Sequence, residues 1–89
     1  MARKLIENRL AACVQIQGGV HSIYRWDGKI CEEQEVLLCA KTLADQWENI
    51  CNFIKSNHPY DLPEVLAFTP EKYEAQSGDW IQAEVKSQI

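Results

Sequence analysis

The chain has 89 residues, a net charge of −4, 46% hydrophobic residues and 25% charged residues. This composition fits one globular domain, residues 1–89, and excludes a disordered chain, a collagen or a coiled coil. The acidic balance argues against nucleic acid as a partner, and no apolar run reaches the roughly 20 residues that span a bilayer, so we expect no membrane partner either. No secretory signal precedes the domain, which predicts a cytoplasmic protein with reduced cysteines.

Residues 2–12 are predicted to form a helix, because apolar side chains recur there at helical spacing. Alternating apolar and polar residues then predict a strand at 14–17, a break or bend at Gly18-Gly19, and a resumed strand at 20–26. The first half of the chain is therefore expected to pair one helix with the start of a sheet.

The dipeptide Asp27-Gly28 is typical of a type I′ turn, which needs positive φ at both central residues. Such a turn predicts a hairpin in which Trp26 faces Lys29 and Tyr24 faces Cys31. The apolar run at 35–41 is typical of a strand that is buried on both faces.

The second half of the chain begins with a clear amphipathic helix pattern. Thr42 and Asp45 form a near capping box, and Pro59 predicts that the helix ends within residues 57–59. Residues 64–69 are predicted to form a short strand, and residues 71–78 a polar loop. A last helix, capped by Ser77 or Asp79, is expected to bury Trp80, Ile81 and Val85.

The resulting order of elements predicts an α+β fold of the ferredoxin-like βαββαβ plan, with its first strand missing and an extra C-terminal helix. In that plan the missing strand lies between the strands at 35–41 and 64–69. We therefore expect either a fragment or late start of a longer protein, or another segment that fills this place.

Two groups of residues, the segment 58–64 and the cysteines, contain candidate metal ligands that also have a purely structural interpretation. Residues 58–64 (HPYDLPE) place an imidazole, a phenol and carboxylates in a turn that two prolines stiffen. His58 there either binds a ligand or caps the end of the preceding helix. Cys31, Cys39 and Cys51 are interpreted as small buried hydrophobic residues, whereas Cys13 is either a core residue or a ligand.

Four sequence blocks resemble the CutA divalent-cation-tolerance family. They are LAACV at 10–14, SIYRWDGKI at 22–30, EVLL at 35–38 with KT at 41–42, and HPYDLPE at 58–64, in family order and spacing. The resemblance implies a ferredoxin-like fold, a homotrimer, a cytoplasmic bacterial protein and binding of copper or another divalent cation. It implies no enzyme. The family's C-terminal Tyr-Leu-x-Trp-Ile element is altered here to 77–81 (SGDWI), with Tyr73 as a candidate replacement for the lost tyrosine.

The resemblance, together with ligand chemistry, nominates a set of site residues. Imidazole and carboxylate suit Cu(II), and a thiolate suits Cu(I). The candidate metal ligands are His58, Cys13, Glu35 and Glu64. The candidate cleft-lining residues are Tyr24, Trp26, Lys41, Tyr60 and Trp80.

Each nomination has a structural alternative. Tyr24 and Trp26 can be aromatic residues of a trimer interface, and Lys41 and Glu35 can form an ion pair.

A second functional hypothesis is a regulatory or scaffold trimer that binds a small ligand between subunits, as nitrogen-regulatory signalling proteins do. A third, an enzyme with His58 and Glu64 as acid and base, lacks a nucleophile–base pair.

Overall fold

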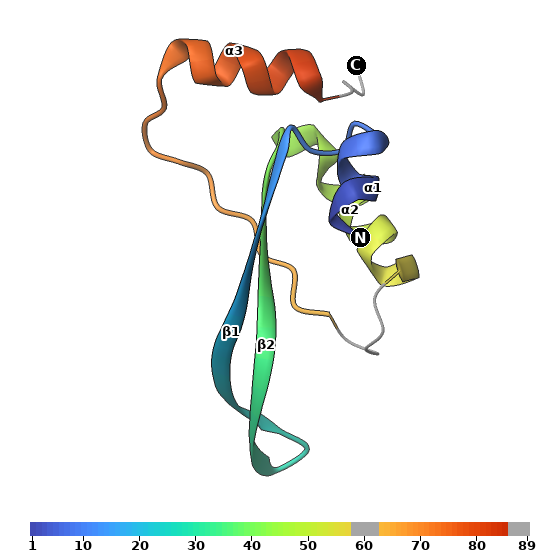
Figure 1. Ribbon diagram of the computed structural model, residues 1–89, viewed down its shortest axis with the longest axis vertical. Coiled ribbons are helices and arrows are strands. Elements are labelled where there is room, and N and C mark those ends of the chain that lie inside the picture. Colours follow the sequence, from blue (N-terminus) through green and yellow to red (C-terminus); the bar gives the residue numbers. More distant parts are fainter. Residues whose placement is uncertain (58–62, 86–89) are drawn as a thin grey trace.

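The computed structural model describes residues 1–57 and 63–85. Its elements are α1 (Ala2–Glu7), β1 (Cys13–Trp26), β2 (Lys29–Lys41), the 3₁₀ turn η1 (Ala44–Gln46), α2 (Trp47–Asn57) and α3 (Ala75–Glu84). The hairpin of β1 and β2 forms a long arm, and the helices gather at the end opposite its turn (Figure 1). No helix in the described part of the chain is long and apolar enough to cross a membrane.

The hairpin turn is the one that the sequence predicts. Asp27 and Gly28 have φ values of 51° and 74°, the positive values that a type I′ turn requires. The expected register is confirmed, since Trp26 pairs with Lys29 and Tyr24 pairs with Cys31. The pairing then runs without a break from the turn to Val20.

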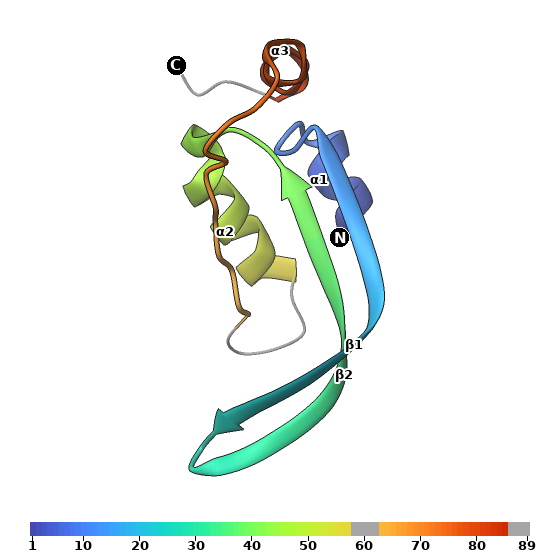
Figure 2. The ribbon, with the colours of Figure 1, turned by 90° about the vertical axis from the view of Figure 1, so that its left-hand side faces the viewer.

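A β-bulge interrupts β1 at Gly18-Gly19 without ending the strand. Gln17 pairs with Leu37 and Val20 pairs with Glu35, so the two glycines oppose the single residue Val36. Gly19 has a φ of 73°, which a residue with a side chain adopts only with strain. The glycines were expected to break or bend the strand, and they bend it (Figure 2).

The first helix is shorter than expected and ends at Glu7 rather than at residue 12. The chain leaves it through a Schellman motif, because the Leu10 amide donates to the Leu5 carbonyl at 2.9 Å and the Arg9 amide to the Ile6 carbonyl at 3.0 Å. Arg9 has a φ of 57° at the position that glycine usually occupies. Apolar residues continue at helical spacing beyond Glu7, and for this reason the sequence predicts a helix that extends to residue 12.

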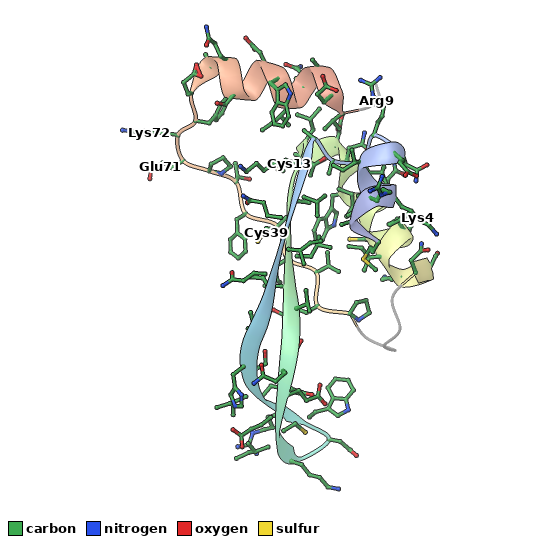
Figure 3. All side chains as sticks on the ribbon, viewed as in Figure 1. Lys4, Arg9, Cys13, Cys39, Glu71 and Lys72 are labelled. Carbon is green, nitrogen blue, oxygen red and sulfur yellow. The ribbon has the colours of Figure 1, made fainter. Side chains whose placement is uncertain are left out.

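The strained arginine joins the first helix to the last. Its guanidinium donates to the carbonyl oxygens of Ala83 at 2.7 Å and Glu84 at 3.1 Å, at the C-terminal end of α3 (Figure 3). These carbonyls carry the partial negative charge of the helix end, which a cation stabilises. Arg9 thereby holds α3 against the turn that follows α1.

The segment between β2 and α2 also differs from the predicted capping box. The Thr42 hydroxyl donates to the Leu10 carbonyl instead of capping a helix. The chain then passes through η1, capped at Leu43 without a side-chain hydrogen bond, before α2 begins at Trp47. Thr42 therefore ties the end of β2 to the segment after α1. α2 runs to Asn57, and the rest of the predicted helix end at 57–59 lies outside the described residues.

Two predictions for the C-terminal third are wrong. Residues 63–70 form no strand, and the sheet of the described chain contains only β1 and β2. In Figure 2 this segment runs apart from β2, in agreement with a sheet of two strands in the described chain. The last helix begins at Ala75, within the expected loop. Glu74 rather than Ser77 or Asp79 caps it, since its carboxylate accepts from the amides of Gln76 and Ser77.

The packed core of a single chain is small. Its buried apolar side chains are Leu5, Ala11, Ile50 and Val85. The 35–41 strand was expected to be buried on both faces, but Val36 and Leu37 are exposed, and Trp80 of the last helix is half exposed. The fold is thus α+β, with large apolar surfaces that one chain leaves open.

Candidate functional site

The bulge determines which candidate residues share a face of the hairpin. Side chains alternate along a strand, and the extra residue in β1 reverses the alternation between Gln17 and Val20. As a result, three cysteines fall on one face, which we call the cysteine face. Its members include Cys13, Cys31, Cys39, Tyr24, Trp26, Glu35 and Lys41.

The helix end of the cysteine face carries two thiols. Cys13 is half-buried and pairs with Lys41, while Cys39 pairs with Gln15 and is exposed. Cys39 is therefore the diagonal neighbour of Cys13 on this face, and both lie at the helix end of the hairpin (Figure 3). The interpretation of Cys39 as a buried hydrophobic residue is wrong. Cys31 and Cys51 are each half-buried.

The middle of the cysteine face carries Glu35, which pairs with Val20 and is half-buried. Six residues separate it from Lys41 on β2, which corresponds to roughly 20 Å along a strand. The alternative of an ion pair between Glu35 and Lys41 is therefore not realised within one chain. For the same reason Glu35 and Cys13 cannot bind one metal ion within a single chain.

The turn end of the cysteine face carries Tyr24 and Trp26. Partial desolvation, a hydrogen bond with the Glu33 carboxylate and the negative charge of Glu33 together raise the pKa of the Tyr24 phenol to about 12. The phenol therefore remains a hydrogen-bond donor throughout the physiological pH range. Trp26, opposite Lys29, is more than half exposed.

The other nominated residues lie away from the hairpin. Trp80 is on α3, and Glu64 is an exposed residue in the segment before it. His58 and Tyr60 lie outside the described residues. The altered C-terminal element has a structural consequence, because a Cβ on Gly78 would lie 2.5 Å from Cε2 of Tyr73. Gly78 on α3 thus leaves room for the ring of Tyr73, which precedes the helix.

Within residues 1–57 and 63–85, no group of three or more His, Cys, Asp or Glu side chains lies close enough to hold a metal ion. The four nominated ligands therefore do not form a complete site among the described residues of one chain. A site that includes Cys13 needs ligands from the segment around His58 or from another chain.

Sequence analysis missed one polar cluster on the opposite face of the hairpin. His21 pairs with Gln34, and its Nε2 lies 3.1 Å from Oε1 of Glu32. The cluster joins a β1 residue to β2 residues that follow it by 11 and 13 positions in the sequence. Only the register of the whole hairpin identifies it.

These elements define an α+β protein in which a long bulged hairpin carries most of the ionisable candidates and helices cover one end. The chain belongs to the CutA1 divalent ion tolerance protein family, whose model matches residues 1–84. The expected family and the expected ferredoxin-like class of fold are both confirmed by this match and by the solved structures below.

Solved and curated relatives agree with this assignment. The divalent-cation tolerance protein CutA of Thermus thermophilus is 40% identical over 82 residues, which cover 92% of this chain and 80% of that protein. Its solved structure gives a TM-score of 0.92 at 39% identity, over 96% of this chain and 82% of that one. Human protein CutA is 38% identical over 98% of this chain, which spans only 49% of the human protein.

A third relative is described by its fold class. The PII-like protein CutA from Nostoc sp. PCC 7120, solved in the apo form, has a TM-score of 0.88 and 34% identity, over 96% of this chain and 83% of that one. The described chain therefore has the fold shared by CutA and PII-like proteins.

Proposed function

We propose that this protein binds copper or another divalent cation as a homotrimer and takes part in divalent-cation tolerance in the cytoplasm, without being an enzyme. Membership in a family named for divalent ion tolerance is the observation that carries the proposal. Cu(II) forms the most stable complexes among first-row divalent ions with imidazole and carboxylate ligands, and Cu(I) favours thiolates.

The proposed ligands are Cys13 and His58, with Glu64 or Glu35 as a carboxylate partner from the same or another chain. Because Cys13 and Glu35 lie roughly 20 Å apart along the hairpin, they would contribute to one ion only from two different subunits. An exposed thiol at Cys39 lies near Cys13 and offers a second sulfur ligand. Tyr24, Trp26, Lys41, Tyr60 and Trp80 are proposed to line the clefts between subunits.

Calorimetric titration of the full chain with Cu(II) tests the proposal. Replacing His58 or Cys13 with alanine removes one ligand and is expected to weaken Cu(II) binding by at least about tenfold. Cys51→Ala is the matched control, since this half-buried thiol lies on α2, away from the hairpin. Unchanged affinity in both ligand variants would overturn the assignment of this site.

A second candidate function is regulation through a small ligand bound between subunits. The likeness to the PII-like Nostoc protein favours it. In this case metal binding is incidental, and titration with nucleotides in place of Cu(II) gives the stronger heat signal. Nucleotide binding without Cu(II) binding would replace the first proposal with the second.

A further inference from the structure

The face of the hairpin opposite the cysteine face carries a polar cluster that the proposed copper site does not use. His21, Glu32 and Gln34 form this cluster, which we call the histidine cluster. His21 Nε2 lies 3.1 Å from Glu32 Oε1, and Gln34 Nε2 lies 3.3 Å from His21 Nδ1. Both imidazole nitrogens of β1 therefore contact side chains of β2.

The register of the hairpin holds the cluster in place. His21 lies directly opposite Gln34, and Glu32 lies diagonally across, opposite Ile23. Strand pairing continues on both sides of these residues, as far as the type I′ turn in one direction and the bulge in the other. The three side chains thus project from a paired, regular part of the hairpin.

We propose that His21 and Glu32 bind a divalent transition-metal ion, Cu(II), Ni(II) or Zn(II), with Gln34 orienting the imidazole. In protein sites the metal–nitrogen and metal–oxygen bonds are about 2.0–2.2 Å long, so two ligands of one ion lie about 2.9–3.4 Å apart. The 3.1 Å between His21 Nε2 and Glu32 Oε1 lies within this range. A small rotation of the carboxylate away from the nitrogen–oxygen line gives the ion room.

Metal binding needs no net loss of a proton from the neutral imidazole. In the metal-free arrangement Nε2–H donates to Glu32, and Nδ1 accepts from the amide nitrogen of Gln34. When Nε2 binds the ion, its proton moves to Nδ1, and a half-turn of the Gln34 amide presents an oxygen that accepts this proton. Ligand histidines in metal sites usually have such a hydrogen-bond partner at the other nitrogen.

Exposure and geometry both favour an ion here. The side chains of His21 and Glu32 are 52% and 60% exposed, so water completes the coordination shell. The one cationic side chain on this face of the hairpin, Arg25, lies opposite Ile30 and is the other diagonal neighbour of Glu32. The Glu32 carboxylate nevertheless contacts the His21 imidazole, at 3.1 Å, which leaves the two groups side by side for an ion.

Nuclear magnetic resonance of the two imidazoles tests the proposal directly, because the chain has only His21 and His58. Titration with Zn(II) is expected to shift the His21 ring signals and to move its proton from Nε2 to Nδ1. Glu32→Gln and Gln34→Ala are each expected to weaken this response by about tenfold or more.

Glu33→Gln is the matched control. It removes the same charge from the adjacent residue of β2, but its side chain lies on the cysteine face. The proposal is overturned if His21 does not respond to Zn(II), or if Glu33→Gln and Glu32→Gln weaken the response equally. His58→Ala separates this site from the proposed copper site, because it is expected to leave the His21 response unchanged.

A gain of affinity gives a second test that does not depend on loss of structure. Ile23→His places another imidazole two residues from His21, on the same face and opposite Glu32. This variant is expected to bind Zn(II) and Cu(II) more tightly than the natural chain. An unchanged or lower affinity would show that this face does not bind these ions.

Discussion

Arg9 is the residue on which two distant parts of the chain depend. Its positive φ is unfavourable for a residue with a side chain, yet this conformation accompanies two hydrogen bonds from the guanidinium to the end of α3. The strained backbone at Arg9 therefore lowers the stability of the fold, whereas the two hydrogen bonds to α3 raise it. A substitution can remove the strain, the hydrogen bonds or both.

Arg9→Ala is expected to lower the free energy of unfolding by about 1–2 kcal/mol, because the left-handed strain stays and both hydrogen bonds to the end of α3 are lost. Arg9→Gly loses the same bonds but relieves the strain, so it is expected to cost less than Arg9→Ala. Urea unfolding of the two variants measures the difference. An equal loss of stability in both would contradict a strained position at Arg9.

Tyr24 gives a prediction about pH. Its pKa in the folded protein is about 12, against 10.0 for an unperturbed phenol, so folding favours the protonated form. Its contribution to stability is therefore complete below about pH 10 and is lost as the pH rises to about 12. Ultraviolet titration of the natural chain, with Tyr24→Phe subtracted, is expected to show this late ionisation.

Glu33→Gln is expected to lower the pKa of Tyr24 toward the ordinary value, because it removes the negative charge next to the phenol. Glu32→Gln serves as the control, since its side chain lies on the opposite face of the hairpin. Ionisation of Tyr24 near pH 10 in the natural chain would contradict the hydrogen bond to Glu33.

At the scale of elements, local chemistry predicted the hairpin well. The Asp27-Gly28 turn and its register depend on residues within a few positions of each other, and both are confirmed. α2 extends to Asn57, which similarly agrees with a nearby proline. These features need no knowledge of how distant parts of the chain pack.

Elements that depend on distant contacts were predicted poorly. Apolar spacing continues past Glu7 and so predicts a longer helix than the structure has. The helix ends early because the chain turns at Arg9, whose side chain contacts the end of α3. Residues 64–69 have the composition of a strand but no paired neighbour in the described chain. A strand forms only beside another strand, and composition alone does not supply one.

The candidate site was predicted in part for the same reason. Sequence blocks nominated Cys13, Glu35 and Tyr24, but they did not indicate that a bulge places these residues on one face. The exposure of Cys39 and the cluster around His21 also follow from register rather than from residue type. Distances between such residues become clear only when both strands are aligned.

At the scale of the whole molecule, one chain exposes more surface than its size warrants. Its accessible surface is 7452 Å², whereas a compact monomer of 10.2 kDa has about 5,300 Å². Its radius of gyration is 14.9 Å, against about 12 Å for a compact domain of this length. Exposed apolar side chains such as Ile30 (70%) and Phe68 (86%) contribute to the excess. This surface supports the proposed assembly.

Sedimentation analysis at micromolar concentration is expected to give three times the chain mass of 10.2 kDa. The midpoint of thermal unfolding is expected to rise with protein concentration, because association stabilises the folded chain. Leu37→Lys is expected to weaken the trimer by placing a charge on the cysteine face of the hairpin, where Leu37 is exposed in a single chain, whereas Gln76→Lys on α3 is the control. A monomeric mass for the natural chain would contradict the trimer.

The Gly18-Gly19 bulge determines which face of the hairpin each residue of β1 occupies. Residues 13–17 and 20–26 follow opposite odd–even rules for which face they occupy, and the single extra residue between them changes the rule. Loss of one glycine would therefore leave a regular ladder, in which the remaining glycine opposes Val36 and every other residue keeps its partner and its face. In evolution, a one-residue deletion here would preserve the neighbours of Tyr24 and His21, whereas loss of both glycines would transfer one half of β1 to the opposite face.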